Sequence, residues 1–277
     1  MQSQPRVKRD AFLQKIHSRP LVLGILNITP DSFSDGGLYQ RPDDAINRAM
    51  AMVAEGCDAV DVGAESTRPG AVPVSEAEEW ARIEPVIGML GSLEVALSID
   101  TYKASVARKA LALGAVMIND VWGLQRDAAM AGTVADGEAL VVIMHNRTSA
   151  DETLDIVADM RGFFDRSLAI AAQAGIPRSH IILDIGIAFG KTSRQNLEAL
   201  RKIGEFKDYG LPLLVGLSRK RFLGSLTGDG IEATPFGTVA ANLMAAAAGA
   251  DIFRVHDVGA QVAAFRVFDR LNRKAIP

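Results

Sequence analysis

Four polar residues spread along the chain have the right chemistry to hold a flat, nitrogen-rich ring: Asp100, Asn119, Asp184 and Lys220. A carboxylate can accept two N–H groups from a guanidine-like edge in a bidentate fit. The lysine can donate to a ring carbonyl or a ring nitrogen, and the amide can both donate and accept. The set therefore suits a planar heterocycle that has a guanidine-like edge and a ring carbonyl.

A second group offers positive charge and hydrogen-bond donors: Arg68, Arg254 and His256. Such side chains stabilise a phosphate or pyrophosphate, above all where negative charge develops during a reaction. Asn27 has no charge of its own, but its amide oxygen could contribute to a Mg²⁺ held mainly by phosphate oxygens. The two groups together predict one site for a flat ring and an anion.

Simpler interpretations compete for several of these residues. Asp100 could cap the helix that follows it, and Arg254 could form a structural ion pair with Asp257. We favour an ordinary loop histidine as the interpretation of His145, which also follows an apolar run. Four methionines at helical spacing are expected in the core: Met50, Met52, Met89 and Met244.

The candidate residues come at or just after short apolar runs of the kind that form buried strands. The first run, Leu21 to Leu26, ends at Asn27, where a long polar loop rich in turn residues opens. Seven more strands are expected over residues 58–63, 95–99, 115–118, 139–144, 180–183, 211–215 and 251–253. Helical patterns separate the strands and cover residues 42–55, 75–90, 105–113, 127–135, 154–174, 194–206, 235–248 and 258–273.

Alternating strands and helices over roughly 250 residues predict a single-domain α/β fold, the (β/α)8 TIM barrel. A doubly wound open sheet is the alternative, but its usual GxGxxG phosphate fingerprint is missing from the first loop. In a barrel, catalytic residues gather at the carboxyl ends of the strands. Polar residues often follow one buried strand, but their presence at nearly all the strand ends favours a shared active site.

The composition limits the class of protein. The 277 residues are 48% hydrophobic and 23% charged, which is ordinary for a globular chain with a large core. The net charge of -3 argues against broad binding of nucleic acid. Because Cys57 is the single cysteine and cannot form an internal disulfide, we expect a cytoplasmic protein. No apolar run reaches the roughly 18 residues of a membrane span.

We expect residues 1–18 to form an arm ahead of a domain at residues 19–277.

One segment is close to a nucleotide-binding P-loop: Gly186 to Thr192, with the sequence GIAFGKT. The P-loop motif needs four residues between its two glycines, and this segment has three. The segment also follows the sixth expected strand rather than the first. We therefore reject a P-loop here.

These motifs, taken in order, resemble the dihydropteroate synthase family of pterin-binding enzymes over nearly the whole domain, from Leu21 to Val258. The segments that carry the resemblance are residues 27–37, 65–70, 98–101, 118–120, 189–191, 218–220 and 254–257. The resemblance implies a (β/α)8 barrel, usually a homodimer, that uses Mg²⁺. It implies condensation of 6-hydroxymethyl-7,8-dihydropterin pyrophosphate with p-aminobenzoate, which gives 7,8-dihydropteroate and pyrophosphate in folate biosynthesis.

The resemblance also implies a role for each candidate residue. The pterin would be held by Asp100, Asn119, Asp184 and Lys220. The pyrophosphate would be held by Thr67, Arg68, Arg254 and His256, and Asn27 would support the magnesium. The p-aminobenzoate pocket would be shaped by Thr67, Pro69, Phe189, Lys220 and Arg221. Of these, the residues implied in catalysis are Asn27, Arg68, Asp100 and Lys220.

Three residues depart from the usual family pattern. Ile185 stands where proline is common, Arg221 where serine is usual, and Asn146 where methionine is common. Ile185 is expected to loosen the turn that follows Asp184. Arg221 is expected to alter the affinity for sulfonamides relative to an Arg221→Ser variant. The residues for the pterin and the pyrophosphate match the family, so activity is expected.

The expected chemistry is a loose substitution in which the first two loops cover the site and exclude water. Magnesium and the cationic side chains would stabilise the negative charge of the departing pyrophosphate. Two other functions are compatible with a pterin-binding barrel. A folate-binding barrel of a methyltransferase system would not need the loop at 67–69 or the pair Arg254 and His256. A binding paralogue without catalysis would not need Asn27, Arg68 or Lys220.

Overall fold

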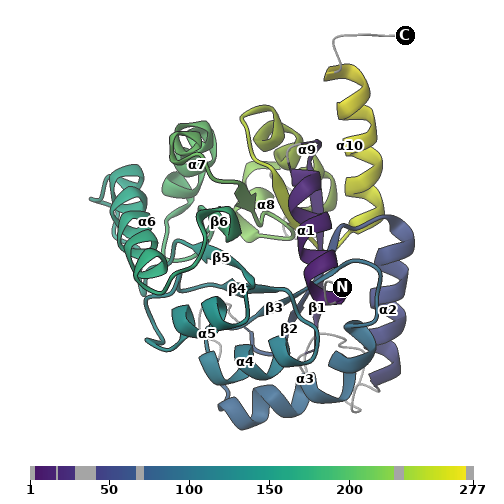
Figure 1. Cartoon of the computed structure of the whole chain (residues 1–277). Helices are drawn as coiled ribbons and strands as arrows, with labels where there is room; N and C mark the ends of the chain where they lie inside the picture. The colour runs from purple at the N-terminus through teal and green to yellow at the C-terminus, as the bar shows by residue number, and fades with distance from the viewer. Residues whose placement is uncertain (1–3, 17, 29–41, 67–71, 228–233, 273–277) are drawn as a thin grey trace.

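The computed structural model describes residues 4–16, 18–28, 42–66, 72–227 and 234–272. Its centre is a closed barrel of eight parallel strands in chain order, and helices surround the barrel on the outside (Figure 1). The last strand pairs with the first, so that Ile252 lies opposite Leu21. The predicted (β/α)8 barrel is therefore confirmed, and the doubly wound open sheet is wrong.

All the strands lie close to their expected positions. They are β1 Leu21–Asn27, β2 Ala59–Gly63, β3 Ala96–Asp100, β4 Met117–Asp120, β5 Leu140–Met144, β6 Ile181–Asp184, β7 Leu213–Val215 and β8 Ile252–Val255. The helices that follow them in turn are α2 Pro42–Glu55, α3 Glu76–Leu90, α4 Ala104–Ala112, α5 Met130–Asp136, α6 Ile156–Gln173, α7 Ser193–Arg201, α8 Arg221–Thr227, α9 Thr234–Ala247 and α10 Val258–Asn272. The short helix α8 was not expected, and the helix expected at 194–206 divides into α7 and a 3₁₀ segment, Ile203–Tyr209.

The barrel separates two apolar cores, because alternate side chains of a strand point to opposite faces of a sheet. The outer core lies between strands and helices and includes Val22 and Val60. The inner core includes Leu21, Leu23 and Leu140 and fills the amino-terminal half of the barrel. Burial on both faces explains why the strands read as continuous apolar runs. The carboxyl-terminal half of the interior is polar, and the candidate site lies there.

Helix α1, Gln4–Ile16, lies against the amino-terminal end of the barrel (purple in Figure 1). Its Phe12 and Ile16 are 2% and 3% exposed and belong to the inner core. Arg9 donates to the carbonyl of Glu138 at 2.7 Å, and Lys8 donates to the carbonyl of Gly91 at 2.7 Å. The segment expected to be an arm ahead of the domain thus contains a helix that contributes side chains to the domain's core.

The expectation that four methionines lie in the core is correct for one of them. Met52 is 1% exposed, whereas Met50, Met89 and Met244 are 56%, 51% and 71% exposed. Residues two apart on a helix face in different directions, so Met50 and Met52 of α2 cannot both face the barrel. Spacing within a helix does not show which face of it is buried.

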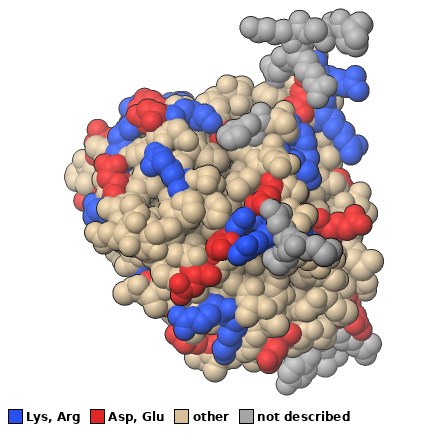
Figure 2. Space-filling view, viewed as in Figure 1, with Lys and Arg blue, Asp and Glu red and all other residues tan. Residues whose placement is uncertain are grey.

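The described helices include none that is long and apolar enough to cross a membrane. On the face shown in Figure 2, positive and negative side chains are interspersed over wide uncharged areas. The described residues on this face form no broad positive field, in keeping with the low net charge of the sequence.

Candidate active site

The ends of the strands bring the predicted ring-binding residues to one rim of the barrel. In the register of the sheet, Asp100 of β3 lies between Gly63 of β2 and Asn119 of β4. Asp184 is the last residue of β6, and Arg254 lies within β8. Because parallel strands end on the same side, these side chains converge inside the mouth of the barrel.

Asp61 lies at the centre of this cluster, and sequence reasoning missed it. Its carboxylate is fully buried and accepts hydrogen bonds from Ser98 Oγ at 2.5 Å, Asn119 Nδ2 at 3.1 Å and Arg254 Nε at 2.6 Å. The signal was a charged residue inside the apolar run of β2, two residues before the strand's end. That spacing places Asp61 on the same face as Gly63, toward the barrel interior.

Arg254 joins the two acidic side chains of the cluster. Its Nη2 donates to Asp100 Oδ2 at 2.7 Å, in addition to the bond from Nε to Asp61. The alternative ion pair of Arg254 with Asp257 is wrong, because Asp257 pairs with Arg219 at 2.7 Å. Arg254 therefore lies beside the ring-binding residues rather than in a surface pair.

Two buried oxygen atoms of the cluster lack a hydrogen-bond partner within the described residues. They are Oδ1 of Asp100 and Oδ1 of Asn119. A buried acceptor without a donor costs on the order of 1–3 kcal/mol, so this pair indicates a ligand that supplies N–H groups. Burial also raises the pKa of Asp100 to about 7, against the opposing charge of Arg254.

Asp100 does not cap the next helix, so that alternative is wrong. The residue before α4 is Lys103, which makes no side-chain cap. The first backbone N–H of α4, at Ala104, instead donates to Asp127 Oδ2 at 2.8 Å. The carboxylate of Asp100 is thus directed into the barrel and not toward the helix.

Asp184 and Lys220 form the opposite side of the mouth. Asp184 Oδ1 accepts the backbone N–H of Gly186 at 2.8 Å, and burial raises the pKa of Asp184 against the charge of Lys220. Lys220 Nζ donates to the carbonyl of Ile187 and lies 5.0 Å from the centre of the Phe189 ring. Burial lowers the pKa of Lys220 to about 8, and the charge of Asp184 opposes this shift. Lys220 is thus a hydrogen-bond donor whose side chain lies beside an aromatic ring.

His256 lies past the end of β8 and is held by its neighbours. Its Nδ1 lies 2.9 Å from Ser218 Oγ, and its backbone N–H donates to the same oxygen at 3.1 Å. Arg48 Nη2 donates to the carbonyl of His256 at 2.8 Å. These contacts fix the backbone of the rim between β7 and β8.

His145 is not the ordinary loop histidine that we favoured from the sequence. Its side chain is fully buried, with Nε2 3.0 Å from Asp159 Oδ2 and Nδ1 2.7 Å from Lys191 Nζ. Burial and the charge of Lys191 lower the pKa of His145 to about 3. Lys191 lies in one of the segments that carry the family resemblance, but the sequence predicts no role for it. Burial lowers its pKa to about 7, and the charge of Asp184 opposes this shift.

Two of the three unusual residues are buried beside this part of the rim. Ile185 is fully buried within the outer core. Asn146 is 9% exposed, and its Nδ2 donates to the carbonyl of Val121 at 2.9 Å. The third, Arg221, begins α8 and is exposed. The expected loosening of the turn at Ile185 stays a prediction.

Asn27 is placed to contribute one oxygen atom to a cation. A Cβ built on Gly63 would lie 3.5 Å from Asn27 Oδ1 and 3.7 Å from Asp100 Oδ2, so both groups face the gap above this glycine. Within the described ranges, no group of three His, Cys, Asp or Glu side chains could hold a metal ion. These donors fit a Mg²⁺ that receives most of its oxygen ligands from a bound phosphate.

Three expected site residues lie outside the described part of the chain: Thr67, Arg68 and Pro69. Glu65, at the described base of this loop, is held by hydrogen bonds from Lys103 Nζ and from the Tyr102 hydroxyl, the latter at 2.7 Å. Lys103 also donates to buried Glu79. A charged network outside the barrel thus supports the start of the loop.

The family described as "Pterin binding enzyme" matches residues 23–256. The dihydropteroate synthase of Bacillus subtilis is 44% identical over 255 residues, which are 88% of this chain and 89% of that protein. The family match extends from within the first strand to the residue after the last strand.

Two solved structures are similar over nearly their full lengths. The dihydropteroate synthase of Xanthomonas albilineans with 4-aminobenzoic acid has a TM-score of 0.88 and 42% identity, covering 94% of this chain and 94% of that one. The Yersinia pestis dihydropteroate synthase in a sulfonamide drug complex has a TM-score of 0.86 and 39% identity, covering 93% and 96%. The similarity in fold and the identity in sequence therefore indicate the same family.

Proposed function

The chain belongs to the pterin-binding enzyme family, and from that premise we propose how its rim residues perform the dihydropteroate synthase reaction. The enzyme is a transferase of folate biosynthesis. It condenses 6-hydroxymethyl-7,8-dihydropterin pyrophosphate with p-aminobenzoate and releases pyrophosphate. The observation that carries the assignment of residues is the pair of buried, unpartnered oxygens on Asp100 and Asn119 among the described residues.

We propose that the pterin lies between the two sides of the barrel mouth. Asp100 and Asn119 would accept N–H groups of the ring on one side. Asp184 would accept from the guanidine-like edge, and Lys220 would donate to the ring carbonyl or a ring nitrogen. Desolvation around these groups supports the proposal, because hydrogen bonds to charged groups are stronger where water is excluded.

The pyrophosphate would lie on the solvent side of the pterin. Arg254 uses two of its five N–H donors on Asp61 and Asp100, and the charge of its guanidinium faces the same mouth. His256 and Arg68 would supply further donors, and Asn27 would hold Mg²⁺ together with the phosphate oxygens. Bound magnesium would neutralise negative charge on the pyrophosphate.

The p-aminobenzoate pocket would lie where Phe189 and Lys220 meet, next to Arg221 and the loop that carries Thr67 and Pro69. The bond between the pterin methylene carbon and the pyrophosphate oxygen breaks, and its electron pair stays on the oxygen. The amine nitrogen then forms the new C–N bond with its lone pair and loses one proton. An effect of Arg221 on sulfonamide affinity stays a prediction.

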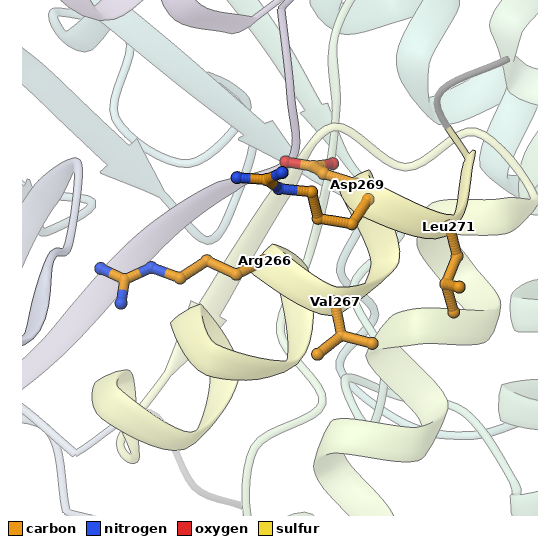
Figure 3. A pocket seen from close by; sticks show the side chains of 5 residues that line it. Arg266, Val267, Asp269 and Leu271 are labelled. Carbon is orange, nitrogen blue, oxygen red and sulfur yellow. The ribbon is translucent and has the colours of Figure 1, made fainter. Parts of the chain in front are cut away.

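We also infer a homodimer formed through helices α9 and α10. Four large apolar side chains on these neighbouring helices are strongly exposed: Phe236 at 86%, Met244 at 71%, Val267 at 60% and Leu271 at 81%. Val267 and Leu271 project to the same side of α10 and line a hollow of about 430 Å³ (Figure 3). Apolar surface of this kind favours association with a second copy. A cytoplasmic location stays a prediction.

An assay of pyrophosphate release tests the function. We expect continued release of pyrophosphate over many turnovers to require p-aminobenzoate, because the amine must bond to the pterin methylene carbon before the site is free again. The variant Asp100→Asn should lower kcat/KM by about a hundredfold or more, since it removes a charged hydrogen bond to the ring. Asp208→Asn, at an exposed ion pair with Arg161, is the control and should match the unmodified enzyme. A protein that binds pterin without releasing pyrophosphate would contradict the proposal.

A further inference from the structure

The loop between β6 and α7 is arranged around one buried amine, the side chain of Lys191. The side chain of Lys191 is 8% exposed. Its Nζ has three acceptors: Nδ1 of His145 at 2.7 Å, the carbonyl of Gly186 at 2.7 Å and the carbonyl of Phe189 at 3.3 Å. An ammonium group has three N–H donors, so the protonated lysine satisfies all three acceptors at once.

A chain of hydrogen-bonded side chains determines the position of the Lys191 amine. His145 accepts from Lys191 at Nδ1, so a neutral imidazole carries its proton on Nε2 and donates it to Asp159. Arg147 holds the same carboxylate with bonds of 2.8 and 2.9 Å. The ring of Phe163 packs edge-on against the imidazole at 5.0 Å. Asp159, His145 and Lys191 thus form a continuous chain from α6 to the loop.

The loop needs such a support, because its backbone turns through unfavourable conformations. Ala188 has a φ of +68°, a left-handed conformation that costs a residue with a Cβ about 1 kcal/mol or more. Gly186 cannot be replaced, because a Cβ at this position would lie 1.8 Å from the carbonyl oxygen of His145. The two carbonyls that bind Lys191 come from either side of Ala188. Their charge-assisted hydrogen bonds offset the strain.

The same loop supplies two contacts to the active site. The carbonyl of Ile187 accepts from Lys220 Nζ, and the ring of Phe189 lies 5.0 Å from that nitrogen. Both residues lie in the turn that is closed around Lys191. The turn around Lys191 thus meets the active site at Lys220.

We propose that Lys191 is a positioning residue that shapes the p-aminobenzoate side of the active site. This inference rests on the proposed function, because it concerns the second substrate of that reaction. Three of the four proposed pterin residues, Asp100, Asn119 and Asp184, end or lie within strands β3, β4 and β6 and are held by the barrel itself. Lys220 would serve both substrates, and Phe189 only p-aminobenzoate. A disturbed loop should therefore change the handling of p-aminobenzoate more than that of the pterin.

Steady-state kinetics of Lys191→Gln tests the split between the two substrates. We expect KM for p-aminobenzoate to rise by about tenfold or more, because hydrogen bonds from a charged group are lost. KM for the pterin pyrophosphate should change by less than about threefold. Lys202→Gln is the matched control, since Lys202 is exposed and, among the described residues, its side chain bonds only Glu198. Equal changes in both KM values would overturn the proposal.

Substitutions of His145 separate positioning from simple loss of stability. Glutamine presents both an acceptor and a donor, so His145→Gln should keep the chain and most of the affinity for p-aminobenzoate. His145→Leu removes both groups and should reproduce the effect of Lys191→Gln. If the two His145 variants had the same KM for p-aminobenzoate, the chain through His145 would have no role in positioning.

Hydrogen exchange tests the inference independently of activity. The amides of Gly186 and Ala188 are bonded to Asp184 and Asn196 at 2.8 and 2.7 Å. Their protection should fall in Lys191→Gln and stay unchanged in Lys202→Gln. Unchanged protection at 185–191 would refute the positioning role even in an active enzyme. If Lys191→Gln lost protection but the unmodified protein released no pyrophosphate, the proposed function would be refuted. The role of Lys191 in holding the loop would remain.

Discussion

At the scale of single residues, the site depends on buried charges that compensate one another. Asp61 and Asp100 share Arg254, and each carboxylate would be costly to bury alone. Asp61 also orients the amide of Asn119, so that its Nδ2 is used inside the barrel and its Oδ1 is left for a ligand. Asp61 contacts no expected substrate, yet its hydrogen bond determines that Asn119 presents Oδ1 to a ligand.

The variant Asp61→Asn tests this arrangement. The neutral amide leaves Arg254 with a single carboxylate and allows Asn119 to turn. We expect kcat/KM for the pterin pyrophosphate to fall by about tenfold to a hundredfold, the size expected for a buried charged hydrogen bond. Asp58→Asn is the control, because Asp58 is also a buried carboxylate and pairs with Arg19 at 2.6 Å near the opposite end of the barrel. A similar loss of kcat/KM in both variants would indicate general destabilisation.

His145 gives the folded protein a specific dependence on pH. Its pKa is about 3 in the folded state against an ordinary value of 6.5. Between these values the unfolded chain binds a proton that the folded protein does not, so stability falls as the pH falls through this window. The groups that face the imidazole, Lys191, Asp159 and Arg147, belong to the same network.

Urea unfolding at several pH values measures this contribution. Between pH 6.5 and about pH 4, the unmodified protein should lose about 3 kcal/mol more free energy of unfolding than His145→Gln, whose amide does not titrate. Parallel curves for the two proteins over this range would show that the histidine is not held neutral.

At the scale of elements, the position of a helix decides whether it supports the core or the site. Helix α1 precedes the first strand, yet its Phe12 and Ile16 complete the inner core at the amino-terminal end. The loops at the other end carry the polar residues. This separation agrees with the general division of a TIM barrel into a stabilising end and a catalytic end.

Removal of one side chain of α1 should therefore affect stability and leave catalysis unchanged. We expect Phe12→Ala to lower the free energy of unfolding by about 3 kcal/mol, the usual cost of a cavity of this size. Val7→Ala, at a position that is 50% exposed, should cost less than about 0.5 kcal/mol. Urea unfolding gives both values. A change in kcat for Phe12→Ala at a temperature where the variant is folded would contradict this separation.

At the scale of the whole molecule, one side of the helical ring has an unusual surface. Helices α9 and α10 lie next to each other on the outside of the barrel (Figure 1). They carry the four exposed apolar residues. Elsewhere on the ring such residues are scattered singly, for example Met89 on α3, which is normal for a soluble protein surface. This cluster is the surface that we propose for the packing of two copies.

A charge at this surface should dissociate the proposed dimer. Light scattering should give a dimer mass for the unmodified protein and for Met89→Glu, and a monomer mass for Met244→Glu. The reason is that a buried, unpaired carboxylate in an interface costs several kcal/mol, about enough to raise the dissociation constant a thousandfold. A monomer in the unmodified protein, or a dimer in Met244→Glu, would refute this interface.

The order of strands and helices, and with it the barrel, could be predicted from the amino-acid sequence alone. Apolar runs and helical periodicity are local properties, and eight such units close in one way. The residues at the strand ends were also predictable, because a strand that ends at Asp100 or Asp184 must present that side chain at the rim.

The partner of each of these side chains, in contrast, depends on the packing of the folded chain. Asp61 was hidden inside an apolar strand, and His145 and Lys191 are 46 positions apart in the chain. The pairing of β5 with β6 sets His145 beside the loop of Lys191, and closure of the barrel between β1 and β8 brings Arg254 to Asp61 of β2. Hydrogen bonds and pKa shifts arise from such long-range contacts, and no local pattern in the chain contains them.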